Sequence, residues 1–375
     1  MDFDFTPEQL SLREAVARWV QKGFPFDRRH AIARAGGATR LIYTELAGLG
    51  LTGLAVPEAQ GGMGFGAVEA MVVMEELGRG LVNAPYAHAA LITPALLTAA
   101  SPELQQAWLP RVADGSALVV LAHQEAAARY RLAQVQTRAR QDGSAWRLTG
   151  AKSVVPAGDE ADAFIVPARI SGDEVEEAGI GLFLVEKTAA KVRGYPTQDG
   201  ARAAEVVLQD SLATLIAARG FEPLEAAVDV GIAAQCAEAV GLMEQLTAIT
   251  VDYMNTRKQF GVSIASFQAL RHRIADVKMQ LELGRSMSYF ATLTLERERA
   301  QRRRAISQAR VQLGHSMRFV GQQCVQLHGG TGVTDEYLGS HYFKRLTMLE
   351  MNFGDTLHHL GEVSARMQDS AGVFA

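Results

Sequence analysis

The segment QLHGGTGVTDEY, residues 326–337, contains three glycines within four positions. It is the clearest candidate for a ligand-binding loop in this sequence. Backbone N–H groups in a glycine-rich loop can approach a phosphate closely, because no Cβ atom stands in the way. The same glycines can also serve only to turn the chain after an apolar, helix-like run. The sequence by itself leaves both interpretations open.

Two other segments invite the same question. Arg257, in TRKQFG at residues 256–261, carries a guanidinium that can hold a phosphate through two parallel hydrogen bonds. Taken alone, an arginine at a helix end is more simply interpreted as the partner of a carboxylate. For VPEAQGGMGFG at residues 56–66, a structural turn is the favoured interpretation.

Composition excludes several classes of protein. The 375 residues are 48% hydrophobic, with a net charge of −4 and a pI near 6.2. This composition indicates a soluble globular protein with two or three domains, without the basic surface that nucleic acid requires. Cys236 and Cys324 lie in apolar helical patterns outside any metal-ligand spacing, so we expect no metal site and a reducing compartment. Since no long uninterrupted apolar stretch or basic leader occurs, we expect a cytoplasmic protein without a membrane span.

Hydrophobic periodicity predicts three domains that must position these residues. Residues 1–118 read as helices, beginning with a capping box at Thr6-Pro7-Glu8-Gln9. Residues 119–215 contain short β-branched runs separated by Gly, Asp and Pro, which indicates a compact β domain. Residues 216–375 return to long helical patterns, for which a four-helix bundle is the economical packing. The helices expected in this last domain cover residues 224–256, 266–299 and 301–327, with a final one after Asp355.

The domain order and four motifs resemble the acyl-CoA dehydrogenases, flavoproteins that desaturate acyl-CoA thioesters between the α and β carbons. The resemblance spans nearly the whole chain and implies the fold of that family: mainly α, with an N-terminal helical domain, a central β-barrel-like domain and a C-terminal four-helix bundle. It also implies FAD, an acyl-CoA substrate, an electron-transferring flavoprotein as electron acceptor, and an oligomer. The motifs are TRKQFG, FQALRHRIADV at residues 267–277, VQLHGGTGVTDEY at residues 325–337, and VPEAQGGMGFG.

The resemblance also implies which residues bind the cofactor. In the family, the matching motifs contact the pyrophosphate and adenosine of an FAD bound mainly in a neighbouring subunit. His358 falls where the family often has a glutamine close to the adenosine. The remaining matched positions are Arg257, Phe260, Gln268, Gln326, Gly329 and Gly330.

The catalytic base of the family has no counterpart. Family members remove the α-proton with a glutamate while a hydride leaves the β-carbon for the flavin, and the matching position here is Gly354, after Phe353. The alternative position used by some members matches Gly231. Asp355 is better interpreted as the N-cap of the last helix. We therefore assign no catalytic residue.

Other ionisable groups lie within or near the relevant segments, and the flavin-ring contacts also depart from the family pattern. Glu125 is expected to close a structural hydrogen bond, whereas Glu350, His123 and His358 are given no catalytic role. Gln124 replaces a threonine, and Val154 and Pro156 replace the tryptophan and threonine that lie against the ring. Aromatic stacking and a hydroxyl donor are therefore missing.

Three functional hypotheses follow. We favour a subunit of a heteromeric acyl-CoA dehydrogenase that completes the FAD site of a catalytic partner subunit, most similar to the small-subunit type of pimeloyl-CoA dehydrogenase. The first alternative is a self-sufficient homotetrameric acyl-CoA dehydrogenase with an atypical base. The second is a helical scaffold that has lost flavin.

Overall fold

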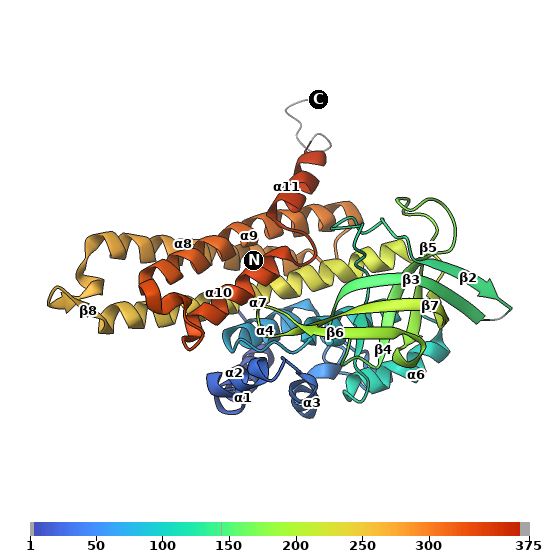
Figure 1. Cartoon of the computed structure of the whole chain (residues 1–375), viewed down its shortest axis with the longest axis horizontal. Coiled ribbons are helices and arrows are strands. Elements are labelled where there is room, and N and C mark those ends of the chain that lie inside the picture. Colours follow the sequence, from blue (N-terminus) through green and yellow to red (C-terminus); the bar gives the residue numbers. More distant parts are fainter. Residues whose placement is uncertain (1–3, 144, 368–375) are drawn as a thin grey trace. The chain divides into compact units, whose positions relative to one another are not determined.

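The computed structural model describes residues 4–143 and 145–367. Within them the chain forms two compact units, and each is described by itself. The first comprises residues before His30, Ala67–Val82, and residues from Ile232 onward; the second comprises His30–Gly66 and Asn83–Gly231. The predicted order of helices, β domain and helices is confirmed (Figure 1).

The first unit is built from long helices and one short hairpin. Helices α8 and α9 pack along their lengths, and α9 also carries α10 and α11 on its sides (Figure 1). The elements of this unit, with α2 and α7 shared between the two units, are α1 (Pro7–Gly23), α2 (Phe26–Arg34), α4 (Ala67–Arg79), α7 (Phe221–Thr256), β8 (Lys258–Gln259), β9 (Val262–Ser263), η5 (Ile264–Ser266), α8 (Gln268–Leu293), α9 (Arg299–His328), η6 (Gly329–Val333), α10 (Leu338–Met351) and α11 (Thr356–Ala365).

Local signals at the helix ends behave as the sequence predicted. The Thr6 hydroxyl accepts a hydrogen bond from the Gln9 backbone N–H, and the Gln9 side chain accepts one from the Thr6 N–H, which completes the capping box of α1.

Where α4 meets α7, Gly78 and Gly241 allow the backbones of the two helices to touch. A Cβ atom on either glycine would collide with a carbonyl oxygen of the other helix, so this crossing requires glycine on both sides.

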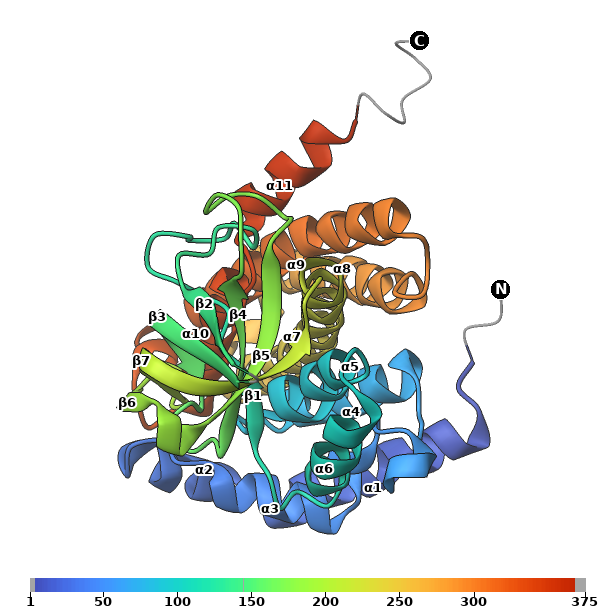
Figure 2. The same cartoon turned by 90° about the vertical axis from the view of Figure 1, so that its right-hand side faces the viewer.

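The second unit holds the β-sheet. Strand β4 pairs with β1, β2 and β5, and the pairings β2–β3, β3–β7 and β7–β5 return to it, so five strands close into a barrel; β6 extends β7 on the outside (Figure 2). The strands are β1 (Val119–Leu121), β2 (Arg138–Asp142), β3 (Ala145–Pro156), β4 (Ala163–Arg169), β5 (Ile180–Glu186), β6 (Lys191–Pro196) and β7 (Arg202–Ala217). The helical elements are α3 (Arg40–Gly48), η1 (Leu51–Gly53), η2 (Glu58–Gln60), η3 (Ala87–Ile92), α5 (Thr93–Leu97), α6 (Pro102–Ala113) and η4 (Lys187–Ala189).

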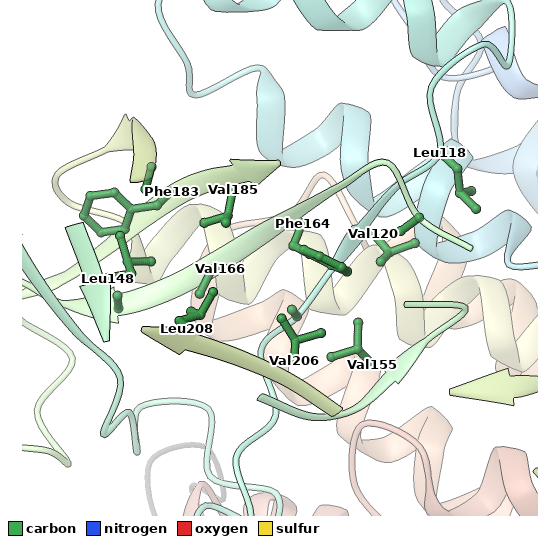
Figure 3. Packing of buried hydrophobic residues seen from close by; sticks show 14 of the residues in the cluster. Leu118, Val120, Leu148, Val155, Phe164, Val166, Phe183, Val185, Val206 and Leu208 are labelled. Atoms are coloured by element: carbon green, nitrogen blue, oxygen red, sulfur yellow. The ribbon is translucent and has the colours of Figure 1, made fainter. Parts of the chain in front are cut away.

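The barrel encloses the core of the second unit. Phe164, Val166 and Phe183 are fully buried and face Leu148, Val206 and Leu208 from the opposite strands (Figure 3). Alternate residues of β3 and β7 point into this core, which is why the sequence showed alternating rather than continuous apolar runs there.

Three elements escaped the sequence interpretation, and one boundary was wrong. Strand β6, hairpin β8–β9 and helix α10 were not predicted, and α8 ends at Leu293 rather than near Arg299. Helix α10 was hidden because its first turn is polar but buried: Ser340 and His341 are each 4% exposed.

Helix α7 is long and apolar enough to cross a membrane by length and composition alone. However, 89% of its most apolar window is buried inside the structure, as in the core helix of a folded protein.

Candidate functional site

Six of the seven predicted cofactor residues gather at one end of the first unit. We call this group the hairpin end: Arg257, Phe260, Gln268, Gln326, Gly329 and Gly330. Helix α7 stops at Thr256, hairpin β8–β9 reverses the chain into α8, and α9 ends beside them at His328 (Figure 1).

A small apolar cluster holds these segments together. Met254 from α7, Ile264 from η5 and Leu327 from α9 are buried against one another. The backbone is fixed as well, because the Arg257 N–H donates to the Tyr253 carbonyl oxygen and the Ile264 N–H donates to the Arg257 carbonyl oxygen. The apolar residues therefore set the positions of the polar side chains around them.

The glycine loop rests on a buried histidine. His328 Nδ1 lies 2.7 Å from the Cys324 carbonyl oxygen, and Nε2 lies 2.7 Å from the Tyr337 hydroxyl. A carbonyl oxygen can only accept, so Nδ1 carries the proton and Nε2 accepts from Tyr337. Burial lowers the pKa of His328, which favours this neutral form. Tyr253 packs against the same ring and its hydroxyl donates to the His328 carbonyl oxygen.

The polar groups of the hairpin end point to solvent without partners. Among the described residues, the side chains of Arg257, Gln268 and Gln326 make no hydrogen bond or ion pair, and all three are exposed. Within the part of the chain that the structure describes, Arg257 is therefore not half of an ion pair with a carboxylate. An exposed, unpaired guanidinium and two exposed amides at the same end of the unit are suited to an anionic ligand with hydrogen-bonding edges.

The backbone of the loop is equally open. Gly329 has φ +61°, and nothing lies within 4 Å of the position that a Cβ atom would occupy on Gly329 or Gly330. Phe260 at the tip of the hairpin is 92% exposed, which is exceptional for a large apolar side chain. The hairpin end therefore offers a cation, amides, open backbone and an aromatic ring to something outside this chain's own fold.

His358 lies elsewhere. It belongs to α11, which packs on the N-terminal half of α9, where the His359 ring lies 3.4 Å from Ser307 Oγ. From Ser307 to His328 the helix rises by about 30 Å at 1.5 Å per residue. The family resemblance alone grouped His358 with Arg257, but within one chain the two residues lie at different ends of α9.

A second group of residues surrounds the segment that was expected to carry a catalytic base. We call it the α10–α11 corner: Arg310 from α9, with Glu350, Gly354, Asp355, His358 and His359. Gly354 has φ +114°, a conformation that side chains with a Cβ atom rarely adopt. An added Cβ would lie 2.5 Å from His358 Cδ2 and 2.7 Å from His359 Nε2. His359 is 1% exposed and its ring also contacts the Phe353 carbonyl oxygen. The space for a side chain at position 354 is thus filled by imidazole rings.

The two acids nearest to Gly354 have structural roles. The Asp355 carboxylate accepts from the His358 N–H at 2.8 Å and caps α11, as the sequence predicted. Glu350 Oε1 accepts from the Thr356 N–H and hydroxyl, and from Arg318.

Arg310, which the sequence interpretation missed, organises the corner. It is 1% exposed and donates to the carbonyl oxygens of Leu349, Asn352 and Gly354, so it satisfies the C-terminal end of α10. No sequence signal marks it, because an arginine in the middle of a helix ordinarily faces solvent.

In the second unit, Glu125 and His123 lie in one of the segments expected near a flavin ring. Glu125 accepts from Gln136, Thr137 and Lys152, and Lys152 holds the pKa of this carboxyl down although burial alone would raise it. Burial lowers the pKa of His123 to about 4, with Lys152 adding to the effect. Glu125 is therefore engaged as expected, and His123 is neutral at physiological pH.

Val154 sits at a bulge of β3 with φ +52°, a strained conformation for a β-branched residue, and is 42% exposed. In the loop at residues 56–66, the N–H groups of Gly62, Met63 and Gly64 donate to carbonyl oxygens of the same loop and of Gly53. Those N–H groups are unavailable to a phosphate, so this loop is a structural turn, as the sequence favoured.

Comparison with known protein families gives two matches that together span most of the chain. Residues 6–116 match the acyl-CoA dehydrogenase N-terminal domain, and residues 218–368 match the acyl-CoA dehydrogenase C-terminal domain. A relative in Bacillus subtilis, the probable acyl-CoA dehydrogenase YngJ, is 26% identical over 368 residues, covering 94% of this chain and 96% of its own.

Two similar solved structures carry names of two components. One is a variant of the Tcur3481-Tcur3483 steroid ACAD; it is 27% identical with a TM-score of 0.88, covering 97% of this chain and 98% of its own. The other is the ChsE4-ChsE5 complex from Mycobacterium tuberculosis, 25% identical with a TM-score of 0.87, covering 99% of this chain and 100% of its own.

Proposed function

Because this chain belongs to the acyl-CoA dehydrogenase family, we propose that it is a flavoprotein subunit that binds the nucleotide part of FAD for a catalytically complete partner subunit and holds no base of its own. The observation that carries this proposal is Gly354, whose side-chain space is filled by His358 and His359. FAD, when bound, supplies the acceptor for the hydride that leaves the β-carbon of the acyl-CoA. The residues of this chain bind and orient it.

The hairpin end fits the diphosphate and adenosine of FAD. Arg257 offers two parallel donors to phosphate oxygens, Gln268 and Gln326 offer amide donors and acceptors, and Phe260 offers a face for an aromatic base. The open backbone at Gly329 and Gly330 allows close approach of the diphosphate. Since these side chains project away from their own cluster, the cofactor that they bind is best completed by another subunit.

No other carboxylate in the corner replaces the missing base. Proton abstraction needs a carboxylate oxygen within hydrogen-bonding reach of the α-carbon proton. Asp355 and Glu350 already accept hydrogen bonds that hold α11 in place, and turning either one toward a substrate would uncap the helix. The self-sufficient enzyme with an atypical base therefore has no candidate residue in this segment.

The names of two similar structures support a heteromeric assembly, because each joins two different components. The finer proposal is a small subunit of the pimeloyl-CoA dehydrogenase type, with acyl-CoA as substrate and an electron-transferring flavoprotein as electron acceptor. We keep His358 in the proposal as a residue that contacts FAD. Because His358 and Arg257 lie at different ends of α9, the FAD that His358 contacts is a different molecule from the one at Arg257. We also propose that the assembly works in the cytoplasm, on the composition and cysteine content given above.

The test is flavin binding with and without a partner subunit. Purified alone, the chain is expected to retain little flavin; co-expressed with a partner dehydrogenase, it is expected to yield one flavin for every two chains, measured near 450 nm. Arg257→Met should weaken flavin retention by about tenfold, the loss of one charge-assisted contact worth about 1.4 kcal/mol. Arg219→Met, at an exposed arginine without a partner among the described residues, is the matched control.

Two outcomes would overturn the proposal. One is a full complement of flavin in the lone chain that acyl-CoA bleaches. The other is unchanged flavin retention in the Arg257→Met complex.

A further inference from the structure

The first turn of α10 holds a buried histidine that lies outside the hairpin end and the α10–α11 corner. His341 is 4% exposed, and both of its ring nitrogens have polar neighbours. Nδ1 lies 2.7 Å from Arg29 Nη1, and Nε2 lies 2.7 Å from the Asp335 carbonyl oxygen. Burying a polar ring is costly unless its hydrogen bonds are made, so both contacts help to keep this imidazole inside the protein.

The two partners fix the position of the proton on the ring. A guanidinium can only donate, so Nδ1 of His341 accepts from Arg29. A carbonyl oxygen can only accept, so Nε2 carries the proton and donates to Asp335. Burial lowers the pKa of His341; the hydrogen bond to Asp335 opposes this effect, and the charges of Arg29 and Lys344 add to it. His341 is therefore a neutral link between Arg29 and Asp335.

The Arg29 end of this link is firmly held. Arg29 belongs to α2 and is 3% exposed, a degree of burial that arginine reaches only when its guanidinium is engaged. The Phe26 ring of the same helix packs edge-on against the imidazole, with ring centroids 5.1 Å apart. The imidazole of His341 is thus fixed by packing as well as by a hydrogen bond.

The Asp335 end of the link reaches the glycine loop. Asp335 lies two residues after η6, the turn that contains the loop glycines. Its carboxylate accepts from Lys344 Nζ of α10 at 3.0 Å. Two residues further on, the Tyr337 hydroxyl donates to Nε2 of His328, at the end of α9. The segment that leaves the glycine loop is therefore tied down at two successive points.

We propose that His341 and Arg29 are positioning residues for the loop that binds the nucleotide part of FAD. This inference rests on the proposed function, which assigns the loop to that cofactor. The His341–Arg29 pair holds the Asp335 carbonyl and, through it, the backbone of η6. In this conformation nothing lies within 4 Å of a Cβ position on Gly329 or Gly330, so phosphate oxygens can approach the backbone. A loop that is ordered before binding loses less conformational entropy when FAD binds, which raises the affinity.

The test compares two substitutions of His341 in the complex with the co-expressed partner dehydrogenase. His341→Phe keeps a flat ring but makes neither hydrogen bond, so the dissociation constant for FAD should rise about fivefold. His341→Gln offers a carbonyl oxygen to Arg29 and an N–H to Asp335, as the two ring nitrogens do. Its dissociation constant should stay within about twofold of the wild type. Titration of the flavin-stripped complex with FAD gives both values.

A matched control separates positioning of the loop from a general loss of stability. Tyr342 is the next residue of α10 and is 2% exposed, and its hydroxyl donates to the Arg79 carbonyl oxygen of α4 rather than to the loop segment. Tyr342→Phe should lower the melting temperature and leave the affinity for FAD unchanged. The amount of FAD bound at saturation should be the same in all variants, which shows that each complex is intact.

Three results contradict the inference. Wild-type affinity in His341→Phe would show that the pair does not act on the loop, and an equal loss in His341→Gln would show that the hydrogen bonds are not the cause. An equal loss in Tyr342→Phe would reduce the effect to destabilisation of α10. Arg257→Met separates this inference from the proposed function. If Arg257→Met keeps its flavin, both are wrong; if it loses flavin while His341→Phe does not, only the positioning role is wrong.

Discussion

At the hairpin end, arginine and glutamine side chains reach solvent without partners among the described residues, whereas at the α10–α11 corner the arginine and both acids are bonded within the chain. Both regions lie in the same unit and are attached to the same helix, α9. The difference separates residues that serve a ligand from residues that serve the fold. Substitution of an unpaired, exposed group should change ligand binding and leave stability nearly unchanged, whereas substitution of an enclosed, hydrogen-bonded group should lower stability.

The largest expected effect is at Gly354. Gly354→Glu restores the family's residue type but must accommodate φ +114° and two imidazole rings, which should cost roughly 4 kcal/mol of stability. Gly361→Glu, in the adjoining helix α11, is the control, because a Cβ there meets nothing within 4 Å. Urea unfolding of both variants measures the difference. A Gly354→Glu chain that is as stable as the wild type and gains acyl-CoA-dependent bleaching of flavin would refute the enclosed-corner interpretation.

The next effect compares two arginines. Arg310→Met removes a buried donor from the carbonyl oxygens of Leu349, Asn352 and Gly354, of which that of Leu349 keeps the Asn352 N–H, and should cost about 3 kcal/mol of stability. Arg257→Met should change stability by less than about 0.5 kcal/mol, because its side chain is exposed and unpaired among the described residues. Urea unfolding and flavin retention should therefore rank the two variants in opposite order. The same ranking in both measurements would contradict the assignment of the hairpin end to ligand binding and of the α10–α11 corner to stability.

These contrasts also mark what the sequence could predict. Local signals sufficed where a residue acts on its neighbours: the capping box at Thr6 and the N-cap Asp355 depend on atoms three residues away. The sequence could not reveal Arg310, whose acceptors lie about 40 residues further along the chain. It also could not place His358, since only the packing of α11 on α9 shows that it lies far from the glycine loop.

A pH effect should follow from His359. Burial, with Arg310 nearby, lowers the pKa of His359 to about 2, from an ordinary value of 6.5. The unfolded chain therefore binds a proton that the folded chain excludes, and stability falls as the pH drops below 6.5 toward 2. The charged or titratable neighbours are Arg310, His358 and Arg303.

The magnitude is measurable. Between pH 7 and pH 5 this single group should cost about 2 kcal/mol of stability. His359→Gln should flatten that part of the profile, seen by urea unfolding at several pH values. An unchanged slope in the variant would mean that His359 is not enclosed as the structure shows.

A smaller loss of stability is expected at the support of the glycine loop. Tyr337→Phe removes the hydroxyl that donates to His328 Nε2 and should cost about 1 kcal/mol of stability. A double-mutant cycle with His328→Phe isolates the bond, because the coupling between the two positions should account for most of that loss. The Tyr337 hydroxyl is engaged with His328, unlike the Arg257 guanidinium, so a change in flavin retention in Tyr337→Phe would act through the position of Gly329. Flavin retention that falls in Tyr337→Phe but not in Arg257→Met would overturn the role given to the guanidinium, and with it the proposal that the hairpin end as a whole binds the nucleotide part of FAD.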